Sequence, residues 1–338
     1  MRGMTRRLAD AAVAAGIAVL AAGCTGNAAP AGSHTSPATA SPALPAPFTI
    51  TAQYTAKSLG LNHPDALAIG PDGNLYVTDL SQRVTVISPV GKVLRRWGKP
   101  GHRPGDFHFT PFDPTSPTDI HGKIAIGPDG KVYVSDSGNG RVQVFTPQGR
   151  FIREFGSFGS GKGQFLKAFD LEVDKAGDVY VSDVQDGTLT KFSPAGKVIW
   201  QIGAGVGSAD LAEGDLHLAS IDVHGRLVVV NDGPGRVSYL DPGGHVVDAF
   251  SPDHSYFPHG QVCEATVDPA GNTYVTGCAL APVIGPTLVY DAAHKLIAEW
   301  PGTPYSLRRS PVFGPHGEVF ALATNGTILK LHVALPGA

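Results

Sequence analysis

A short segment that recurs along the chain is the strongest constraint on its fold. The copies at 67–79 and 124–136 read LAIGPDGNLYVTD and IAIGPDGKVYVSD, and further copies lie at 171–183, 219–232, 265–277 and 311–323. Their equivalent aromatic or apolar positions are spaced by 57, 47, 49, 45 and 46 residues: Tyr76, Tyr133, Tyr180, Val229, Tyr274 and Phe320. Self-similarity at such a period indicates a repeat protein, in which each copy forms one supersecondary unit.

Each unit has the pattern of a four-stranded antiparallel meander. A short apolar strand ends at Pro-Asp-Gly, where proline presets one turn dihedral and glycine accepts a positive φ. A second strand rich in β-branched and aromatic residues follows, then a third strand (83–88 or 141–146), a second glycine turn and a fourth strand ending near Trp97 or Phe155. No helical periodicity separates these strands. The pattern therefore predicts an all-β fold, a six-bladed β-propeller.

Two further features resemble the NHL repeat. One is the run from Arg150 to Gly156, followed by Gly-Gln-Phe at 163–165. The other is an aspartate at the end of the second strand with an arginine after it, as in Asp79 with Arg83, Asp136 with Arg141 and Asp232 with Arg236. The resemblance covers 48–338 and implies six NHL-like blades with the aspartate and arginine as a structural staple. The long first interval predicts an insertion at 107–116.

The two ends of the repeat region predict how the ring closes. The sixth unit stops after three strands, whereas the orphan segment 48–54, Phe-Thr-Ile-Thr-Ala-Gln-Tyr, alternates like a strand. We expect this segment to be the outermost strand of blade six, because that pairing satisfies backbone groups at an otherwise open edge.

The first 23 residues have the features of an export signal. Arginines at 2, 6 and 7 precede an apolar run from Ala11 to Ala22, which is too short to span a bilayer comfortably. The sequence Leu-Ala-Ala-Gly-Cys at 20–24 resembles the lipobox of bacterial lipoproteins, which implies lipidation of Cys24 and cleavage before it. The alternative is an ordinary secretory peptide cut nearby. Residues 24–47 are uncharged and rich in Ala, Ser, Thr and Pro, which predicts a tether.

The net charge of the chain after signal cleavage indicates which classes of partner are unfavourable. Cleavage removes three of 26 basic and one of 29 acidic residues, leaving 23 and 28 and a net charge of −5. This mildly acidic chain argues against a nucleic-acid footprint. The expected location is the outer face of a bacterial plasma membrane, with a monomeric propeller held there by its lipid.

Cys263 and Cys278 flank the hairpin that turns at 268–272. If Val267 pairs with Tyr274, the same register sets the two cysteines opposite each other, at a distance that a disulfide accepts. Export favours oxidation. The alternative is a pair of buried thiols.

The mouth of the central channel is the expected ligand site, since the first strands of all blades begin there. The candidate ligand-binding residues are His63, Asp65, Asp119, His121, Lys123, Asp170, His217, His259, Glu264 and Arg309. Converging imidazoles and carboxylates could hold calcium or zinc, for which the candidates are Asp65, His217 and Glu264. Gluconolactonase-like enzymes and peptidylglycine-amidating lyases are related propellers that use such a metal.

Three functions remain open. The first is a binding or scaffolding propeller that presents loops such as 101–118 and 279–286 to an envelope protein, peptide or glycan. The second is a metal-dependent lactonase or lyase with its site at the channel mouth. The third is a sensor or solute-binding module for a small envelope ligand. No cofactor is expected from a recognisable motif, and no residue stands out as catalytic.

Overall fold

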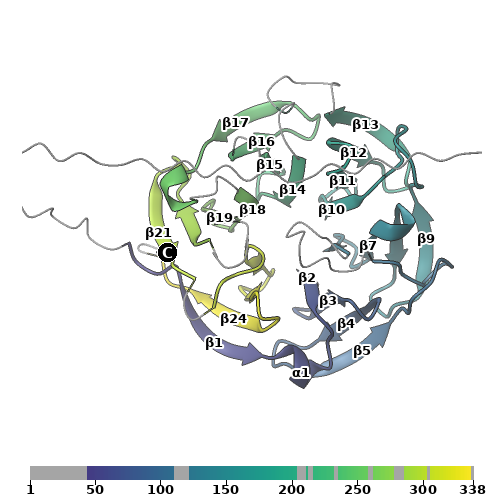
Figure 1. The fold of residues 1–338 in the computed structure, drawn as a ribbon, viewed down its shortest axis with the longest axis horizontal. Helices are drawn as coiled ribbons and strands as arrows, with labels where there is room; N and C mark the ends of the chain where they lie inside the picture. Colours follow the sequence, from purple (N-terminus) through teal and green to yellow (C-terminus); the bar gives the residue numbers. More distant parts are fainter. Residues whose placement is uncertain are drawn as a thin grey trace, which may run out of the picture. The chain divides into compact units, whose positions relative to one another are not determined.

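Each repeat unit folds into one antiparallel sheet of four strands, and the six sheets form a ring (Figure 1). The computed structural model describes residues 44–109, 122–203, 211, 216–231, 235–257, 262–277, 285–302 and 305–335. The first three blades are β2 (Pro64–Ile69), β3 (Leu75–Asp79), β4 (Arg83–Ile87) and β5 (Val93–Trp97); β6 (Ile124–Ile126), β7 (Val132–Asp136), β8 (Arg141–Phe145) and β9 (Phe151–Phe155); and β10 (Ala168–Val173), β11 (Val179–Asp183), β12 (Thr188–Phe192) and β13 (Val198–Gly203).

The other three blades follow the same order from the channel outward. They are β14 (Leu216–Ile221), β15 (Leu227–Asn231), β16 (Arg236–Leu240) and β17 (Val246–Phe250); β18 (Val262–Val267), β19 (Thr273–Gly277), β20 (Thr287–Tyr290) and β21 (Leu296–Trp300); and β22 (Val312–Phe313), β23 (Val319–Leu322), β24 (Ile328–Val333) and β1 (Phe48–Tyr54). The helices of the described residues are short: α1 (Ala56–Leu59), η1 (Ser137–Asn139) and η3 (His254–Tyr256). The predicted all-β six-bladed propeller is confirmed.

The hydrophobic core is divided among the interfaces between neighbouring blades. Six apolar clusters lie one at each interface, because both faces of every sheet are covered by another sheet. The recurring anchor of the second strand is buried in every blade, with at most 3% exposure: Tyr76, Tyr133, Tyr180, Val229, Tyr274 and Phe320. The repeated sequence position therefore marks the centre of each blade.

The Pro-Asp-Gly turn joins the first two strands of blade one as expected. The Gly73 N–H donates to the Gly70 carbonyl at 2.9 Å, and Gly73 has a φ of +72°. A Cβ at this position would also lie 2.6 Å from a carboxylate oxygen of Glu318. Glycine is therefore required at this turn by its backbone conformation and by the close approach of blade six.

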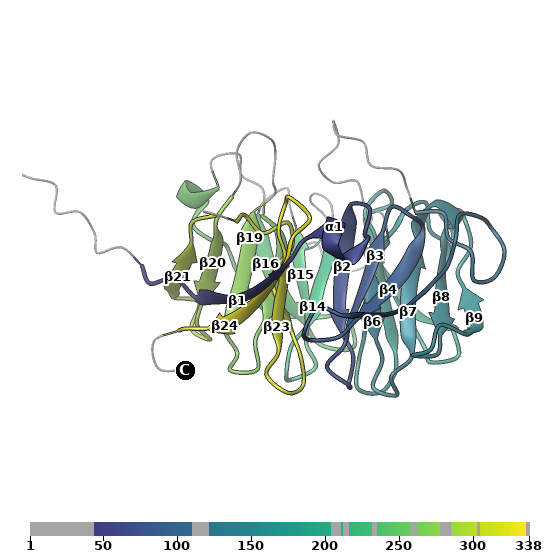
Figure 2. The ribbon, with the colours of Figure 1, turned by 90° about the horizontal axis from the view of Figure 1, so that it is seen from below.

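The N-terminal strand β1 completes blade six, as the alternating pattern of 48–54 predicted. It pairs antiparallel with β24 from Phe48 opposite Val333 to Tyr54 opposite Ile328, and Figure 2 shows the two strands side by side. The Phe48 ring also stacks on Tyr274 of blade five at a centroid distance of 5.4 Å. One strand therefore closes the sheet and packs against the neighbouring blade.

The start of the predicted insertion was wrong. Phe107 forms a parallel bridge with Pro100, just as Phe165 does with Phe158, and both Phe107 and Phe165 are fully buried. Phe107 thus belongs to the repeat, because its ring fills the same gap between blades. Only residues after Phe107 can belong to an insertion, and residues 110–121 lie outside the described residues.

The predicted staple is confirmed most clearly in blade two. Asp136 is fully buried, and its Oδ2 accepts from Arg141 Nε at 2.8 Å and from Asn139 Nδ2 at 2.8 Å. In blade one the Arg83 Nε lies farther from Asp79, at 3.4 Å. In blade four Asn231, not Asp232, pairs with Arg236, so an amide occupies the end of β15; Asp232 itself lies outside the described residues.

Replacing Asp136 with asparagine is expected to destabilise the protein by about 1–3 kcal/mol, because the buried Arg141 guanidinium loses the buried one of its two anionic acceptors and keeps only Glu154. Urea unfolding of the purified protein would measure this loss. The matched variant Asp79→Asn removes a longer contact to a half-exposed arginine and is expected to cost less. Equal losses in the two variants would contradict a role for the close ion pair.

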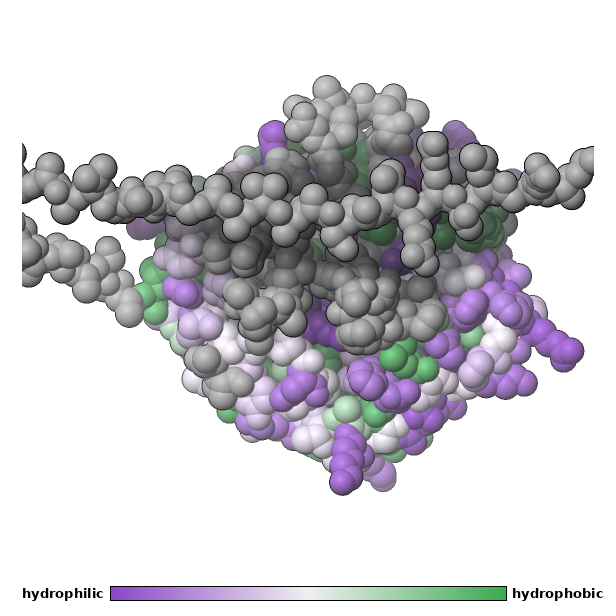
Figure 3. Space-filling view, in the orientation of Figure 1, coloured by the Kyte–Doolittle hydropathy of each residue, from purple (hydrophilic) through white to green (hydrophobic). Residues whose placement is uncertain are grey.

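The outer surface of the propeller is chemically mixed. On the face drawn in Figure 3, hydrophilic and hydrophobic residues alternate around the visible rim. A mixture of this kind is ordinary for a folded protein. No helix in the described part of the chain is long and apolar enough to cross a membrane. The channel is therefore the more informative place to look for a ligand site.

Candidate ligand site at the channel mouth

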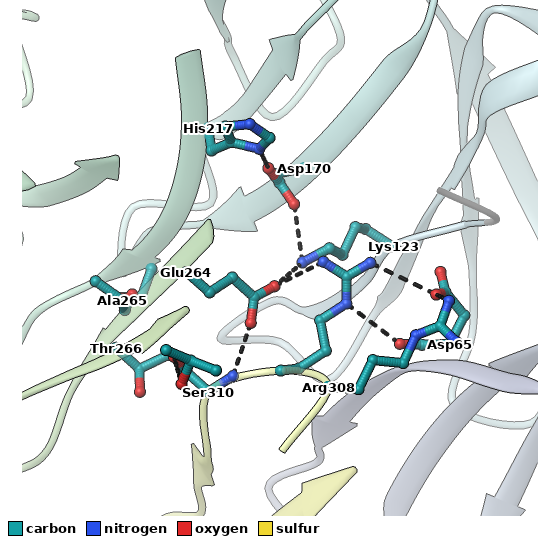
Figure 4. A network of polar contacts seen from close by, with 12 residues as sticks. Asp65, Lys123, Asp170, His217, Glu264, Ala265, Thr266, Arg308 and Ser310 are labelled. Carbon is teal, nitrogen blue, oxygen red and sulfur yellow. Dashed lines mark hydrogen bonds and ion pairs between the residues drawn. The ribbon is translucent and has the colours of Figure 1, made fainter. Parts of the chain in front are cut away.

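A network of charged side chains occupies the channel where the innermost strands begin (Figure 4). It combines three carboxylates, three cations and one imidazole, and every blade contributes. The members are Asp65 on β2, Lys123 just before β6, Asp170 on β10, His217 on β14, Glu264 on β18, and Arg308 and Arg309 just before β22. Residues more than 200 positions apart in the sequence thus meet at one axis.

Arg309 joins blades five, six and one. Its Nη1 donates to Glu264 Oε1 at 2.8 Å, and its Nη2 lies 3.5 Å from Asp65 Oδ1. Arg308 Nη2 donates to the same Asp65 oxygen at 3.0 Å. Asp65 is fully buried, so the two guanidinium groups supply the compensating charge that a buried carboxylate needs.

Lys123 connects opposite sides of the channel. Its Nζ lies 2.8 Å from Asp170 Oδ1 and 2.6 Å from Glu264 Oε1. Blades two and five are three positions apart in a ring of six, so the contact between Lys123 and Glu264 crosses the axis. The Ser310 N–H donates to the other Glu264 oxygen at 2.8 Å. An ion pair held from three blades therefore spans the channel.

Electrostatics keeps this bridge charged. Burial would raise the pKa of Asp170 and of Glu264, but Lys123 and Arg309 together, with His217 also acting on Asp170, outweigh burial and hold both pKa values below their usual range. Burial and Arg309 would lower the pKa of Lys123, yet these two carboxylates raise it. Because the acids are weak bases and the ammonium holds its proton, these groups are suited to binding charge more than to moving protons.

His217 extends the network into blade four. Its side chain is buried, and its Nδ1 lies 3.6 Å from Asp170 Oδ2. Asp170 therefore faces Lys123 with one oxygen and the imidazole with the other. An imidazole beside a carboxylate is oriented by it and can be stabilised in its protonated form.

The sequence prediction missed Glu172, which lies two residues after Asp170 on β10. Both side chains line a cavity that offers about 70 Å³ to the centres of water molecules, enough for several waters. Within the described residues, the Glu172 carboxyl group has no hydrogen bond or ion pair. Burial raises its pKa to about 8. Alternation along the strand could have revealed this residue, because positions two apart share a face.

Glu172→Gln is expected to raise the melting temperature at pH 8 by several degrees and to leave it almost unchanged at pH 4.5. A folded pKa near 8, above the unfolded value of 4.5, gives a contribution that is fully present below pH 4.5 and is lost as the pH rises through 8. Glutamine avoids this loss because it carries no proton to release. Thermal melts between pH 4.5 and 9 would test this, with Glu299→Gln on β21 as control. A difference independent of pH would contradict it.

The other predicted site residues have different fates. His63 is exposed, and its Nδ1 contacts Asn62 Oδ1 at 2.8 Å. Asp119, His121 and His259 lie outside the described residues. The network thus contains Asp65, Lys123, Asp170, His217, Glu264 and Arg309 of the ten candidates, together with Arg308.

The candidate metal ligands already have partners in the network. Arg309 contacts both Asp65 and Glu264, and His217 faces Asp170. Within the described ranges, no group of three His, Cys, Asp or Glu side chains is placed to hold a metal ion. A calcium or zinc site at these residues stays a prediction, and it would require Arg309 to move.

The register used to pair the cysteines was wrong by one residue. Val267 pairs with Thr273, because the turn from Asp268 closes at Asn272, and a bulge between Val262 and Glu264 shifts the register again. Cys263 lies at this bulge. Cys278 and the lipidation candidate Cys24 lie outside the described residues, so the disulfide between Cys263 and Cys278 stays a prediction.

Comparison with known proteins agrees with this fold. Residues 122–145 match the family model of the NHL repeat. The chain is a six-bladed β-propeller that carries an NHL repeat. The match spans the approach to β6 and continues to the end of β8, so it includes Lys123 of the network.

Similarity to individual proteins is partial in sequence and broad in fold. A segment of 114 residues is 36% identical to mouse peptidyl-glycine alpha-amidating monooxygenase, covering 30% of this chain and 10% of that protein. The chain thus matches about a tenth of this relative's length. Virginiamycin B lyase from Staphylococcus aureus has a TM-score of 0.57 at 12% identity, covering 85% of this chain and 100% of the other. Hydrazine synthase from Kuenenia stuttgartiensis has a TM-score of 0.52 at 18% identity, covering 77% and 74%.

Proposed function

We propose that this protein is an extracytoplasmic binding propeller, whose ligand is recognised by the charged network at the channel mouth. The observation that carries the proposal is the ion pair between Lys123 and Glu264 across the axis. Buried ion pairs add little stability over well-packed apolar side chains, because both charges must be desolvated. A channel that only had to be filled could use apolar residues, so the retained charges favour a role in recognition.

The proton affinities in the network also favour binding over catalysis. The lowered pKa values of Asp170 and Glu264 make them weak bases, and the raised pKa of Lys123 makes it a weak acid at neutral pH. A general base works best with a pKa near the operating pH. Fixed charges of both signs suit a partner that presents complementary charges, such as an envelope peptide, protein or glycan.

Attachment to the membrane forms part of the proposal. We infer that Cys24 carries the lipid and that residues 24–47 hold the propeller away from the outer face of the plasma membrane. Cys24→Ala is expected to shift the protein from the membrane fraction to the medium of expressing cells. Continued sedimentation of this variant with membranes after a carbonate wash would refute the lipid anchor.

Binding can be tested with the immobilised propeller and an extract of envelope peptides and glycans. A compound retained by the wild type, identified by mass spectrometry and lost with Glu264→Gln, would support the proposal. Glu299→Gln on the outer strand β21 is the matched control and should retain it. If the wild type retains no compound, or if Glu264→Gln retains the same set, the channel mouth is not the recognition site.

A lyase is the second candidate, favoured by the pairing of His217 with Asp170 at 3.6 Å. A carboxylate that orients an imidazole can support proton abstraction, and similar propellers include a protein named as a lyase. Incubation with the same extract would then yield new products, and these would disappear with His217→Ala. Elemental analysis adds a separate readout, since a stoichiometric divalent ion lost with Asp65→Ala or Glu264→Ala would favour the metal-dependent enzyme.

A further inference from the structure

Among the described residues, the channel has four carboxyl groups and three cations from lysine and arginine. Each of three carboxylates contacts a cation: Asp65 with Arg308 and Arg309, Asp170 with Lys123, and Glu264 with Lys123 and Arg309. Glu172 is the fourth carboxyl group and has no ion pair with any described residue. It is partly buried, and the surface that it does expose lines the cavity. The described channel residues therefore leave room for one additional positive charge beside Glu172.

The walls of the cavity define the rest of the ligand. One side is polar and contains Glu172, Thr266 and the bridging groups of Lys123, Asp170, Glu264 and Arg309. The neighbouring strand β14 contributes an apolar side with Leu218 and Ala219, and apolar residues of the other blades complete the lining. A bare metal ion would gain nothing from this apolar side. A short alkyl group attached to a cation would bury against it.

The cavity also limits the size of the ligand. About 70 Å³ of space for water centres accommodates only a few non-hydrogen atoms. Glu172 lies deeper along β10 than Asp170, so the bridge from Lys123 to Glu264 stands between Glu172 and the mouth where the strands begin. These limits favour a small free molecule over the end of a polymer.

We propose that the cavity beside Glu172 binds a small primary alkylamine, with its ammonium group against the Glu172 carboxylate and its alkyl group against Leu218 and Ala219 of the neighbouring strand β14. The inference rests on the proposed function only in taking the channel as the ligand site. The cavity is then a second subsite, which lies below the ion pair between Lys123 and Glu264 and takes small alkylamines.

Amine binding is expected to release a proton from Glu172. Because the pKa of Glu172 is raised to about 8, this carboxyl is mostly protonated at pH 7 in the free protein. The entering ammonium stabilises the carboxylate, so one proton leaves Glu172 for solvent as the amine binds. The charged groups facing Glu172 are Lys123, Asp170, Glu264 and Arg309; their pKa shifts keep them charged, and β2 and β14 add no titratable side chain to the cavity wall.

Isothermal titration calorimetry with propylammonium chloride tests the proposal on the whole folded protein. At pH 7 we expect millimolar binding, in the order of what a ligand of this size can achieve, with about one proton released per amine. Titrations in phosphate and in HEPES buffer count that proton, because the two buffers differ in ionisation enthalpy and neither is a primary amine. The affinity should rise from pH 6 to pH 8 as Glu172 loses its proton.

Three controls make the result decisive. 1-Propanol has the same shape without the charge and should not bind. Glu172→Gln should lose at least about tenfold in amine affinity, together with the proton release. Glu299→Gln, on the outer strand β21, should bind like the wild type.

Undiminished amine binding by Glu172→Gln would overturn the proposal, since it would mean adventitious binding elsewhere. Binding without proton release at pH 7 would also overturn it. A failure of the proposed function appears differently, as the absence of any envelope compound that depends on Glu264. Glu172→Gln is expected to fold, and its thermal melt would verify this independently of binding.

Discussion

Removal of residues 48–54 is expected to lower the melting temperature by about 15 °C or more and to broaden the transition. These residues form β1, which supplies the outermost strand of blade six and pairs with β24 along its whole length. Without it, the backbone groups of β24 lose their partners and the N- and C-terminal parts of the chain are no longer tied in one sheet. Thermal unfolding followed by circular dichroism in the β region measures the effect.

A point substitution in the same strand separates packing from backbone pairing. Phe48 is buried against Tyr274 and Trp300, with ring centroids 5.4 Å and 5.9 Å away, so Phe48→Ala is expected to cost about 3–5 kcal/mol. At about 2 °C per kcal/mol for a chain of this size, the melting temperature falls by about 6–10 °C. The exposed Thr51 on the same strand provides the control, and Thr51→Ala should change the melt by about 1 °C or less. An unchanged melt after deletion of 48–54 would refute closure of the ring by β1.

Lys123→Met is expected to be the most destabilising single change in the channel, at about 3–5 kcal/mol near neutral pH. The substitution keeps much of the volume of the side chain but leaves Asp170 and Glu264 buried without the ammonium that both contact. A second change, Glu264→Gln, removes one of the two carboxylates that lose the ammonium. The double variant should therefore be more stable than Lys123→Met alone, and chemical unfolding of the four proteins forms the corresponding cycle.

The loss of stability in Lys123→Met should also depend on pH and should be larger at neutral than at acidic pH. In the wild type, the lowered pKa values of Asp170 and Glu264 contribute stability that is present above their unfolded pKa values and is lost as the pH falls through the folded ones. In the variant, Asp170 loses its contacting ammonium and Glu264 keeps only Arg309, so both pKa values rise relative to the wild type and the carboxyl groups protonate more readily on folding. The deficit relative to wild type should be largest at pH 7 and should shrink toward pH 4. Lys162→Met changes an exposed lysine and should show neither the deficit nor its pH dependence.

Much of the candidate site could be identified from the repeat alone. Aligning the copies assigned Lys123, Asp170 and Glu264 to one level of the channel, and the structure brings all three together. Glu172 was missed because its neighbours at the same level in other blades are small or neutral, so the alignment offered no cluster there. The interaction between Lys123 and Glu264 was missed for a different reason. It depends on which blades stand opposite, and that follows from the closed ring rather than from any local pattern.

Short sequence patterns were sufficient to predict the strands and their grouping into blades. Alternation, glycine turns and the recurring aromatic anchor act over a few residues, so the strands, the blade count and the closing strand 48–54 could be derived without coordinates. The register around Cys263 and the charge balance beside Glu172 required the folded protein. A bulge shifts the strand register by one residue without a clear mark in the sequence pattern, and the pKa of Glu172 depends on its burial in the channel beside Lys123, Asp170 and Glu264. Short-range preferences thus determine the strands, whereas the chemistry of the axis arises only where all six blades meet.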